Sequence, residues 1–196
     1  MARRTVQRER RLQILKALDT CIQEKSFERT TIRDIARAAG VNHGVLHCYF
    51  RDKEEILLAY IDYVMDDYSA QARQWLGGID PGSMTRKAFL EEVFAFVNHR
   101  ITLNLGLSRV FVEIWEIALY HPQVRDKLRQ AYTRWIDELS SIVYGHAEDT
   151  SFARNVCVAM VAFWEGMALF STLFGPDELS AEEVLAGFQQ RITDLL

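Results

Sequence analysis

The chain has 196 residues, of which 49% are hydrophobic and 26% charged, and its 11 Phe, 7 Tyr and 4 Trp can fill a core, which excludes a disordered or collagen-like chain. The formal net charge of -4 hides an asymmetry, because residues 1–53 hold 12 basic and 6 acidic side chains whereas the other residues hold 11 and 21. Such a basic segment is typical of one that meets a polyanion, although a solvated charged face is the alternative. Its densest run is Arg3, Arg4, Arg8, Arg10, Arg11 and Lys16.

Helical periodicity covers most of the chain, and no stretch alternates apolar and polar residues as a half-buried strand does. We therefore predict an all-α fold of about nine helices. The first helix is expected over about residues 5–25, where Leu15, Leu18 and Ile22 are spaced three and four residues apart and so share one face.

Two short helices are expected next. The first runs over about residues 32–39, where Thr31 is a good N-cap and Asp34 stands three residues later, which is the capping-box pattern. Gly40 ends this helix, because glycine adopts the left-handed conformation without strain. One residue separates Gly40 from Asn42, the next N-cap candidate. Two short helices joined by a tight turn form a helix-turn-helix, whose second helix can lie in the DNA major groove.

The longer helices follow this motif. Asp52 and Glu55 form a second capping-box pattern, which opens a fourth helix that extends to Leu76, and the glycine-rich segment at residues 77–82 ends it. Five further helices are predicted over about residues 85–103, 108–120, 122–144, 152–174 and 181–196. Pro122 fits the first position of its helix, since the N–H of that position is not used.

Residues 30–56, with the sequence TTIRDIARAAGVNHGVLHCYFRDKEEI, resemble the DNA-binding signature of the TetR family of bacterial transcription regulators. The resemblance implies a helix-turn-helix DNA-binding head at residues 1–51. It also implies that the fourth helix links this head to an effector-binding and dimerisation domain within residues 52–196. The expected function is that of a homodimeric repressor that binds an inverted-repeat operator in double-stranded DNA and is released by a small-molecule effector.

The same resemblance implies which residues contact DNA. In the family, bases or phosphates are contacted by the positions that match Asn42, His43, Val45, His47 and Tyr49. Phosphate contacts are expected from Thr31 at a helix N-terminus and from the basic side chains of Arg33 and Lys53. Gly44 has no Cβ and would allow the backbone to approach DNA closely.

The helical geometry of the predicted recognition helix agrees with this assignment. At 100° per residue, Leu46 lies about 160° from Gly44 and from Cys48, so a core-facing Leu46 leaves both on the outer face. The chain departs from the common family pattern at Val45, His47 and Cys48, where many members have Thr or Ser, Tyr and His. The operator sequence is therefore not carried over. An exposed Cys48 is either an ordinary small residue or a redox-sensitive thiol.

The middle helices are expected to hold the effector. The candidate ligand-binding residues, each of which also fits ordinary core packing, are Phe94, His99, Phe111, Trp115, Trp135, Met160 and Trp164. Glu113, Glu116 and Glu165 interrupt apolar faces, and beside tryptophan they would hold an organic cation, unless they are exposed or paired with arginine. Residues 111–141 resemble the choline-responsive branch of the family. A lipophilic or cationic effector is therefore expected.

The predicted helix at residues 152–174 is hydrophobic nearly all round, as expected for one that packs in its own domain and against a partner chain. The predicted dimer-interface residues are Phe152, Val156, Phe163, Met167 and Phe170, with Phe188 and Ile192 on the last helix. A membrane-spanning helix is the alternative, but Glu165 at its centre argues against one. We expect no membrane association and a cytoplasmic location, because the N-terminus lacks a secretory signal.

No motif supports an enzyme. The sequence holds no G-x-S-x-G, H-E-x-x-H or glycine-rich phosphate loop, and its 5 histidines are scattered. Cys21, Cys48 and Cys157 form no pair suited to a disulfide framework or a zinc site. We expect no catalysis, metal or cofactor. A helical interaction module or small-molecule binder without DNA binding is the remaining alternative, and the basic head argues against it.

Overall fold

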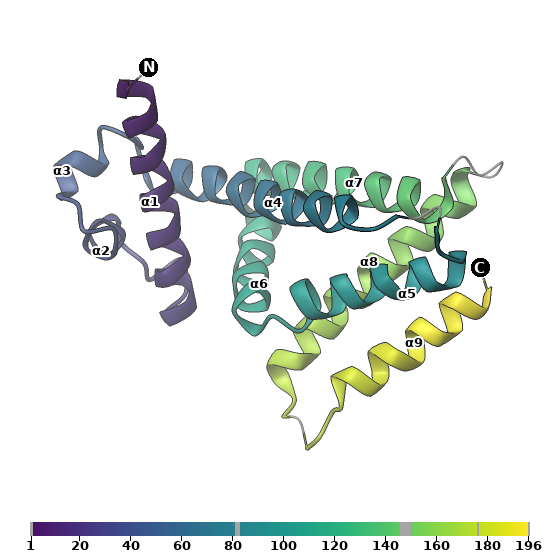
Figure 1. Cartoon of the computed structure of the whole chain (residues 1–196). Helices are drawn as coiled ribbons and strands as arrows, with labels where there is room; N and C mark the ends of the chain where they lie inside the picture. Colours follow the sequence, from purple (N-terminus) through teal and green to yellow (C-terminus); the bar gives the residue numbers. More distant parts are fainter. Residues whose placement is uncertain (1, 81–82, 146–149, 176, 196) are drawn as a thin grey trace. The chain divides into compact units, whose positions relative to one another are not determined.

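The computed structural model describes residues 2–80, 83–145, 150–175 and 177–195, and within these ranges every regular element is helical (Figure 1). This confirms the predicted all-α fold. The elements are α1 (Ala2–Glu24), α2 (Ile32–Ala38), α3 (His43–Leu46), α4 (Lys53–Gly77), α5 (Arg86–Val97), a π-helix η2 (Asn98–Thr102), α6 (Leu105–Tyr120), α7 (Pro122–Tyr144), α8 (Thr150–Leu173) and α9 (Ala181–Leu195).

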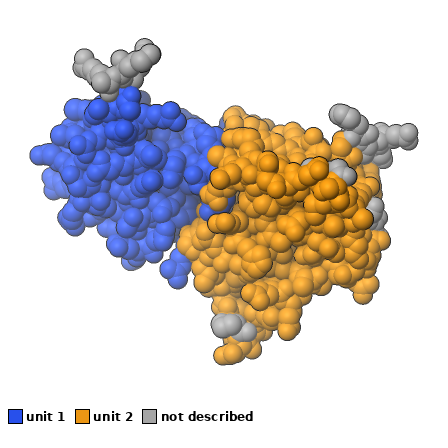
Figure 2. Space-filling view, in the orientation of Figure 1, with its two compact units in different colours: residues 1–68, 109–128 blue, residues 69–108, 129–196 orange. Residues whose placement is uncertain are grey.

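Packing divides the chain into two compact units (Figure 2). Unit 1 comprises residues 1–68 and 109–128, and unit 2 comprises residues 69–108 and 129–196. The helices α4, α6 and α7 each contribute residues to both units. The functional boundary predicted after residue 51 follows the DNA-binding motif, so it does not coincide with this division and stays a prediction.

Unit 1 is built on apolar side chains from its first four helices. Ile14 and Leu18 of α1, Ile35 of α2 and Leu46 of α3 are fully buried, and Ile61 of α4 is nearly so. Full burial of one such side chain contributes about 1.5–3 kcal/mol to folding. The packed core therefore holds the short helices α2 and α3, which are too short to be stable alone.

The predicted ends of α2 and the predicted start of α3 are confirmed, whereas α3 ends at Leu46 and not at Cys48 or Tyr49 as its pattern suggests. Thr31 and Asp34 form the reciprocal capping box of α2. Gly40 has φ +61°, the left-handed conformation that ends helices, and the Oδ1 of Asn42 accepts the N–H of Gly44 at 2.8 Å. The capping box predicted at Asp52 is not fully reciprocal. The carboxylate of Glu55 accepts the N–H of Arg51, the residue before Asp52, at 2.8 Å and not the N–H of Asp52 itself. Asp52 still caps α4 by accepting the N–H of Glu55 at 2.8 Å.

The helix predicted over residues 85–103 is interrupted. The α-helix α5 ends at Val97, and η2 continues with π-helical hydrogen bonding. Asn98 at the start of η2 is buried, and its Oδ1 accepts the indole N–H of Trp164 at 3.0 Å. The helix predicted from residue 108 begins earlier, at Leu105, because Asn104 precedes it and its Oδ1 accepts the N–H of Leu107 at 3.1 Å. Single-turn π-helices are frequent at functional sites.

Unit 2 is built around α8. Cys157, Met160, Trp164 and Met167 of this helix lie in one buried cluster with Phe94 of α5 and with residues of α7 and α9. By length and composition alone, residues 151–173 could also cross a membrane, a property that buried core helices share. The helix is therefore apolar all round, as predicted, and its inward face is used by the chain's own core.

Candidate nucleic-acid interface

The outer face of α3 is open to solvent. Leu46 is fully buried, whereas Asn42, His43, Gly44, Val45, His47 and Cys48 around it are exposed. This is the orientation that the helical spacing predicts. The rings of His43 and His47 meet edge to face, with centroids 4.8 Å apart. The helix therefore presents two imidazoles, one valine side chain and a glycine backbone on one accessible surface.

Two side chains of α1 bind the carbonyl ends of the short helices. Arg11 donates from Nη1 to the carbonyl of Tyr49 at 2.5 Å, and Gln13 donates from Nε2 to the carbonyl of Ala39 at 2.6 Å. The Arg11 guanidinium also lies over the Phe50 ring, 4.0 Å from its centroid. Carbonyls at helix C-termini lack intrahelical partners, so these bonds stabilise the positions of α2 and α3. In the sequence, Arg11 stands out only as one member of a basic run.

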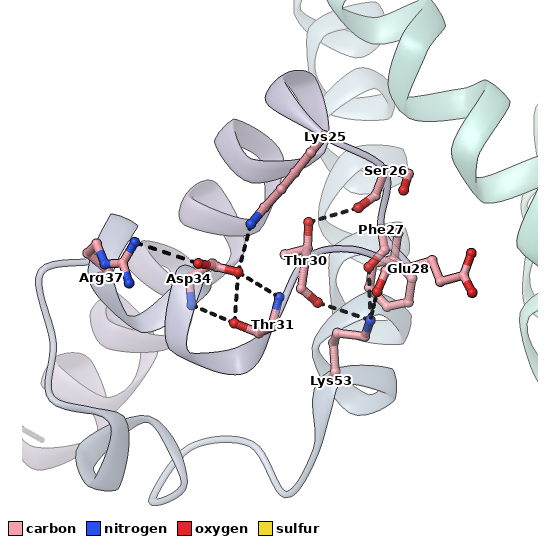
Figure 3. A network of polar contacts seen from close by, with 9 residues as sticks. All are labelled: Lys25, Ser26, Phe27, Glu28, Thr30, Thr31, Asp34, Arg37 and Lys53. Carbon is pink, nitrogen blue, oxygen red and sulfur yellow. Dashed lines mark hydrogen bonds and ion pairs between the residues drawn. The ribbon is translucent and has the colours of Figure 1, made fainter.

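Lys53 is enclosed by the turn at residues 26–30, which joins α1 to α2 (Figure 3). Its Nζ donates to the carbonyls of Phe27 at 2.8 Å, Thr30 at 3.1 Å and Glu28 at 3.4 Å. The ammonium also lies 4.2 Å from the centroid of the Phe27 ring. Burial lowers the pKa of Lys53 from its ordinary value. An ammonium has three N–H donors, so the predicted phosphate contact of Lys53 would require it to exchange one of these carbonyls.

The N-terminus of α2 holds a second polar cluster (Figure 3). Lys25 donates to Asp34 at 2.7 Å, and the Thr31 hydroxyl donates to the same carboxylate at 2.7 Å. The bond from Lys25, with further bonds from Thr31, holds the pKa of Asp34 well below its usual range. The hydroxyl proton of Thr31 is therefore used in the cap, whereas Arg33 on the same helix is exposed. Of the phosphate contacts predicted here, that of Arg33 requires no rearrangement of the cap.

Comparisons with known proteins agree with this geometry. Residues 14–60 match the family model described as bacterial regulatory proteins, tetR family. The HTH-type transcriptional regulator BetI of Serratia proteamaculans (strain 568) is 25% identical over 166 residues, which cover 85% of this chain and 82% of BetI. The DNA-binding motif of this chain is that of the TetR family, and the chain resembles regulators of that family over most of its length. It is a transcriptional regulator and not an enzyme.

Solved structures show that the TetR fold extends over both units. The FadR regulator of Bacillus subtilis in complex with stearoyl-CoA has a TM-score of 0.64 and 16% identity, over 94% of this chain and 96% of that one. A transcriptional regulator from Saccharomonospora viridis in complex with choline has a TM-score of 0.70 and 17% identity, over 95% and 94%. At such identities the likeness is one of fold.

The predicted effector residues do not all come together. Phe94, Met160 and Trp164 are buried in the cluster of unit 2, and Trp135 packs against it. The rings of Phe94 and Trp164 lie 5.2 Å apart. His99 is also in unit 2 but is exposed on η2. Phe111 and Trp115 belong to unit 1, and Trp115 is 43% exposed.

The acidic candidates Glu165 and Glu113 lie in different units and have different hydrogen-bond partners. Glu165 of α8 accepts a hydrogen bond from the Tyr132 hydroxyl at 2.8 Å, and burial raises the pKa of Glu165 to about 7. Glu113 instead accepts a backbone N–H in unit 1 at 2.8 Å. The hydroxyl of Thr102 on η2 is buried without a hydrogen-bond partner in the described part of the chain. The sequence does not indicate this group, because a lone threonine belongs to no motif.

The predicted dimer residues of α8 and α9 differ in exposure. Phe152 is 58% and Phe170 is 47% exposed, whereas Met167 is buried in the core. Phe163 and Phe188 stack on one another with ring centroids 3.8 Å apart. The other predicted interface residues are partly buried and pack against the core of unit 2; they are Val156, Phe163, Phe188 and Ile192. The structure therefore leaves Phe152 and Phe170 accessible and uses Met167 inside the chain.

Proposed function

We propose that this TetR-family regulator is a homodimeric repressor that binds an inverted-repeat operator and is released by a small molecule held in unit 2. The observation that carries the proposal is the outer face of α3, which is exposed while Leu46 anchors the helix in the core. Repression of chromosomal genes also implies a cytoplasmic location.

The residues on this face have side chains suited to reading base edges. His43 and His47 carry ring nitrogens that donate or accept hydrogen bonds, and Val45 has methyl groups that suit a thymine methyl. The carboxamide NH2 of Asn42 can donate, because the cap uses only its oxygen. The exposed Arg33 is the strongest phosphate-contact candidate among the predicted basic residues, because Lys53 is already bonded to the α1–α2 turn. Phosphate contacts set the register of a protein on DNA without reading sequence.

Fluorescence anisotropy with duplexes selected from a random library tests the DNA-binding part. We expect the selected duplex to bind more tightly than a shuffled one and the logarithm of affinity to fall linearly with the logarithm of salt concentration. H43A should weaken binding to the selected duplex more than to the shuffled one, whereas R33A should weaken both alike. Equal affinity for selected and shuffled duplexes at every salt concentration would reject sequence-specific binding.

The dimer proposal is supported by apolar side chains that α8 exposes. Leu173 is 66%, Phe170 47% and Val158 38% exposed on this one helix. Exposed apolar surface of this kind favours a protein partner, and two-fold pairing of two copies would present two α3 helices to half-sites one DNA turn apart. This arrangement is what an inverted-repeat operator requires.

The effector proposal is supported by the polar groups in unit 2. Glu165 with Tyr132 offers a carboxylate in a largely apolar setting, and such a group suits a cationic effector with an apolar part. Solved structures that are similar in fold include one with choline and one with stearoyl-CoA. Titration calorimetry with choline and with stearoyl-CoA tests both classes. For a cationic effector, E165Q should weaken choline binding about tenfold or more, and unchanged choline binding would reject Glu165 as its anchor.

A further inference from the structure

Phe27 lies in the turn between α1 and α2, and both its backbone N–H and its carbonyl form hydrogen bonds with side chains of other helices. Its N–H donates to the Oε2 of Glu113 on α6 at 2.8 Å, and its carbonyl accepts the Nζ of Lys53 on α4 at 2.8 Å. All three residues belong to unit 1. Two helices outside the helix-turn-helix therefore bind the one turn that leads into it.

The position of this turn determines where α2 begins. The N–H and the hydroxyl of Thr30 donate to the carbonyl of Ser26 at 3.1 and 3.0 Å, so the turn is closed on itself, and Thr30 is buried. Thr31, the next residue, is the N-cap of α2. A displacement of Phe27 would therefore be passed to α2 and, through the short turn at Gly40, to α3.

The helix that carries Glu113, α6, also contributes residues to unit 2. The first residues of α6, from Leu105 to Ser108, belong to unit 2, and Glu113 lies about one and a half turns further along the same helix. We propose that Glu113 is a positioning residue for DNA binding: its carboxylate fixes the α1–α2 turn and thereby the helix-turn-helix. This rests on the proposed function and extends it by naming the contact through which α6 acts on the head.

The chemistry of the bond supports this role. A carboxylate that accepts a backbone N–H forms a shorter and stronger hydrogen bond than a neutral acceptor does. Without it the Phe27 N–H loses its partner, and the turn samples more conformations. DNA binding would then have to order the turn, which lowers affinity.

The chain offers a matched control on the same helix. Glu116 lies three residues after Glu113, and both line one cavity of about 790 Å³ that also borders Phe27 and Lys53. Glu116 is exposed and its carboxylate forms no bond to the turn. Substituting either residue removes one negative charge from the same part of unit 1. Charge loss alone would tighten binding to DNA, which is the opposite of the effect expected for Glu113.

The test uses the full-length chain and its E113A, E113Q and E116A variants. Affinity is measured for a duplex that the wild type selects from a random library, together with hydrogen exchange of the Phe27 amide and thermal unfolding. We expect E113A to weaken duplex binding by roughly 3- to 10-fold, with an unchanged salt slope because no phosphate contact is lost. The Phe27 amide should exchange faster in E113A. E113Q keeps an acceptor oxygen and should restore most of the affinity, and E116A should not weaken binding.

Each outcome decides between the two proposals. A wild type that selects a duplex, with E113A binding it as tightly, would overturn the positioning role alone. Weakening by E113A that E113Q does not rescue, or that follows general unfolding of unit 1, would overturn it as well. A wild type that selects no duplex would overturn the proposed function and the positioning role with it.

Discussion

Lys53 and Arg11 are basic residues of unit 1 whose donors reach main-chain carbonyls. Lys53 binds three carbonyls of the α1–α2 turn, and Arg11 binds the carbonyl of Tyr49, three residues after the end of α3. Each side chain thus satisfies backbone acceptors that the short helices and turns leave open. Positive charge in unit 1 therefore serves internal structure as well as any attraction to phosphate.

Replacement of Lys53 by methionine should separate these two roles. K53M leaves three carbonyls without their donor, and we expect a loss of about 1–3 kcal/mol in the free energy of unfolding, measured by urea denaturation. The slope of affinity against salt should stay as in the wild type if Lys53 acts only on the turn. K16M is the control, because it removes the same charge from an exposed position on α1. A slope reduced by about 1 in K53M would instead identify a phosphate contact.

Protonation of Glu165 should make the free energy of unfolding depend on pH. Burial is the main cause that raises the pKa of Glu165 to about 7, from the 4.5 of an unperturbed carboxyl, while the Tyr132 hydroxyl bond acts in the opposite direction. Between these values the folded chain binds more protons at this site than the unfolded chain. The contribution of Glu165 to stability therefore falls as pH rises from 4.5 to about 7 and is constant above it.

The E165Q variant should show this directly. We expect the difference in unfolding free energy between E165Q and wild type to grow in favour of E165Q by up to about 3 kcal/mol between pH 5 and 8. Glutamine keeps an acceptor for Tyr132 but carries no charge to bury. Urea denaturation at each pH measures the difference, and E182Q on α9, an exposed position, is the control. Parallel curves for E165Q and wild type would contradict a buried, proton-binding Glu165.

At the scale of elements, two glycines in the helix-turn-helix have different reasons to be there. Gly40 has φ +61° between α2 and α3, and a side chain in that conformation is strained. Gly44 lies within α3, where a Cβ would meet only the Asn42 Oδ1 at an ordinary 3.5 Å. Internal packing therefore accounts for Gly40 but not for Gly44.

Alanine substitutions should reveal the difference. G40A should lower the unfolding free energy by about 1–2 kcal/mol, because alanine is strained at positive φ. G44A should leave stability unchanged or raise it by up to about 1 kcal/mol, since alanine favours helix, and it should weaken duplex binding because its methyl group holds the backbone away from DNA. Urea denaturation and anisotropy measure the two effects. Undiminished DNA binding by G44A would show that the backbone there does not approach the duplex.

At the scale of the whole molecule, α8 has two uses. Its inward residues, among them Met160 and Trp164, form the core of unit 2, while Phe170 and Leu173 remain exposed. A helix apolar on both faces fits a chain that pairs with a copy of itself. The proposed repression at an inverted repeat would depend on that pairing, because one head contacts only one half-site.

F170E should test the pairing. A carboxylate on this exposed apolar surface would be buried on association, so we expect the dimer to dissociate to monomers in sedimentation velocity. Duplex affinity should fall at least about tenfold, since each head would then bind alone. L119E is the control, because Leu119 is 71% exposed on α6 and outside the predicted interface. A dimer that persists in F170E, with circular dichroism unchanged, would place the interface elsewhere.

The sequence by itself determined the all-α fold, the ends of α2, the start of α3, and the orientation of the recognition helix. Thr31, Gly40 and Asn42 act on atoms within a few residues of themselves, and helical period alone places Leu46 inward. These interactions are local, so their patterns can be read directly along the chain.

Only the tertiary structure decided how the distant parts act on one another. Lys53 meets Phe27 across 26 residues and Glu113 meets it across 86, and no local pattern predicts such partners. Periodicity likewise marks α8 as apolar on every side, but it cannot say that Met167 is covered by the chain's own core and Phe170 is not. The physical reason is that burial and hydrogen bonding depend on what packs against a residue, which the folded chain alone specifies.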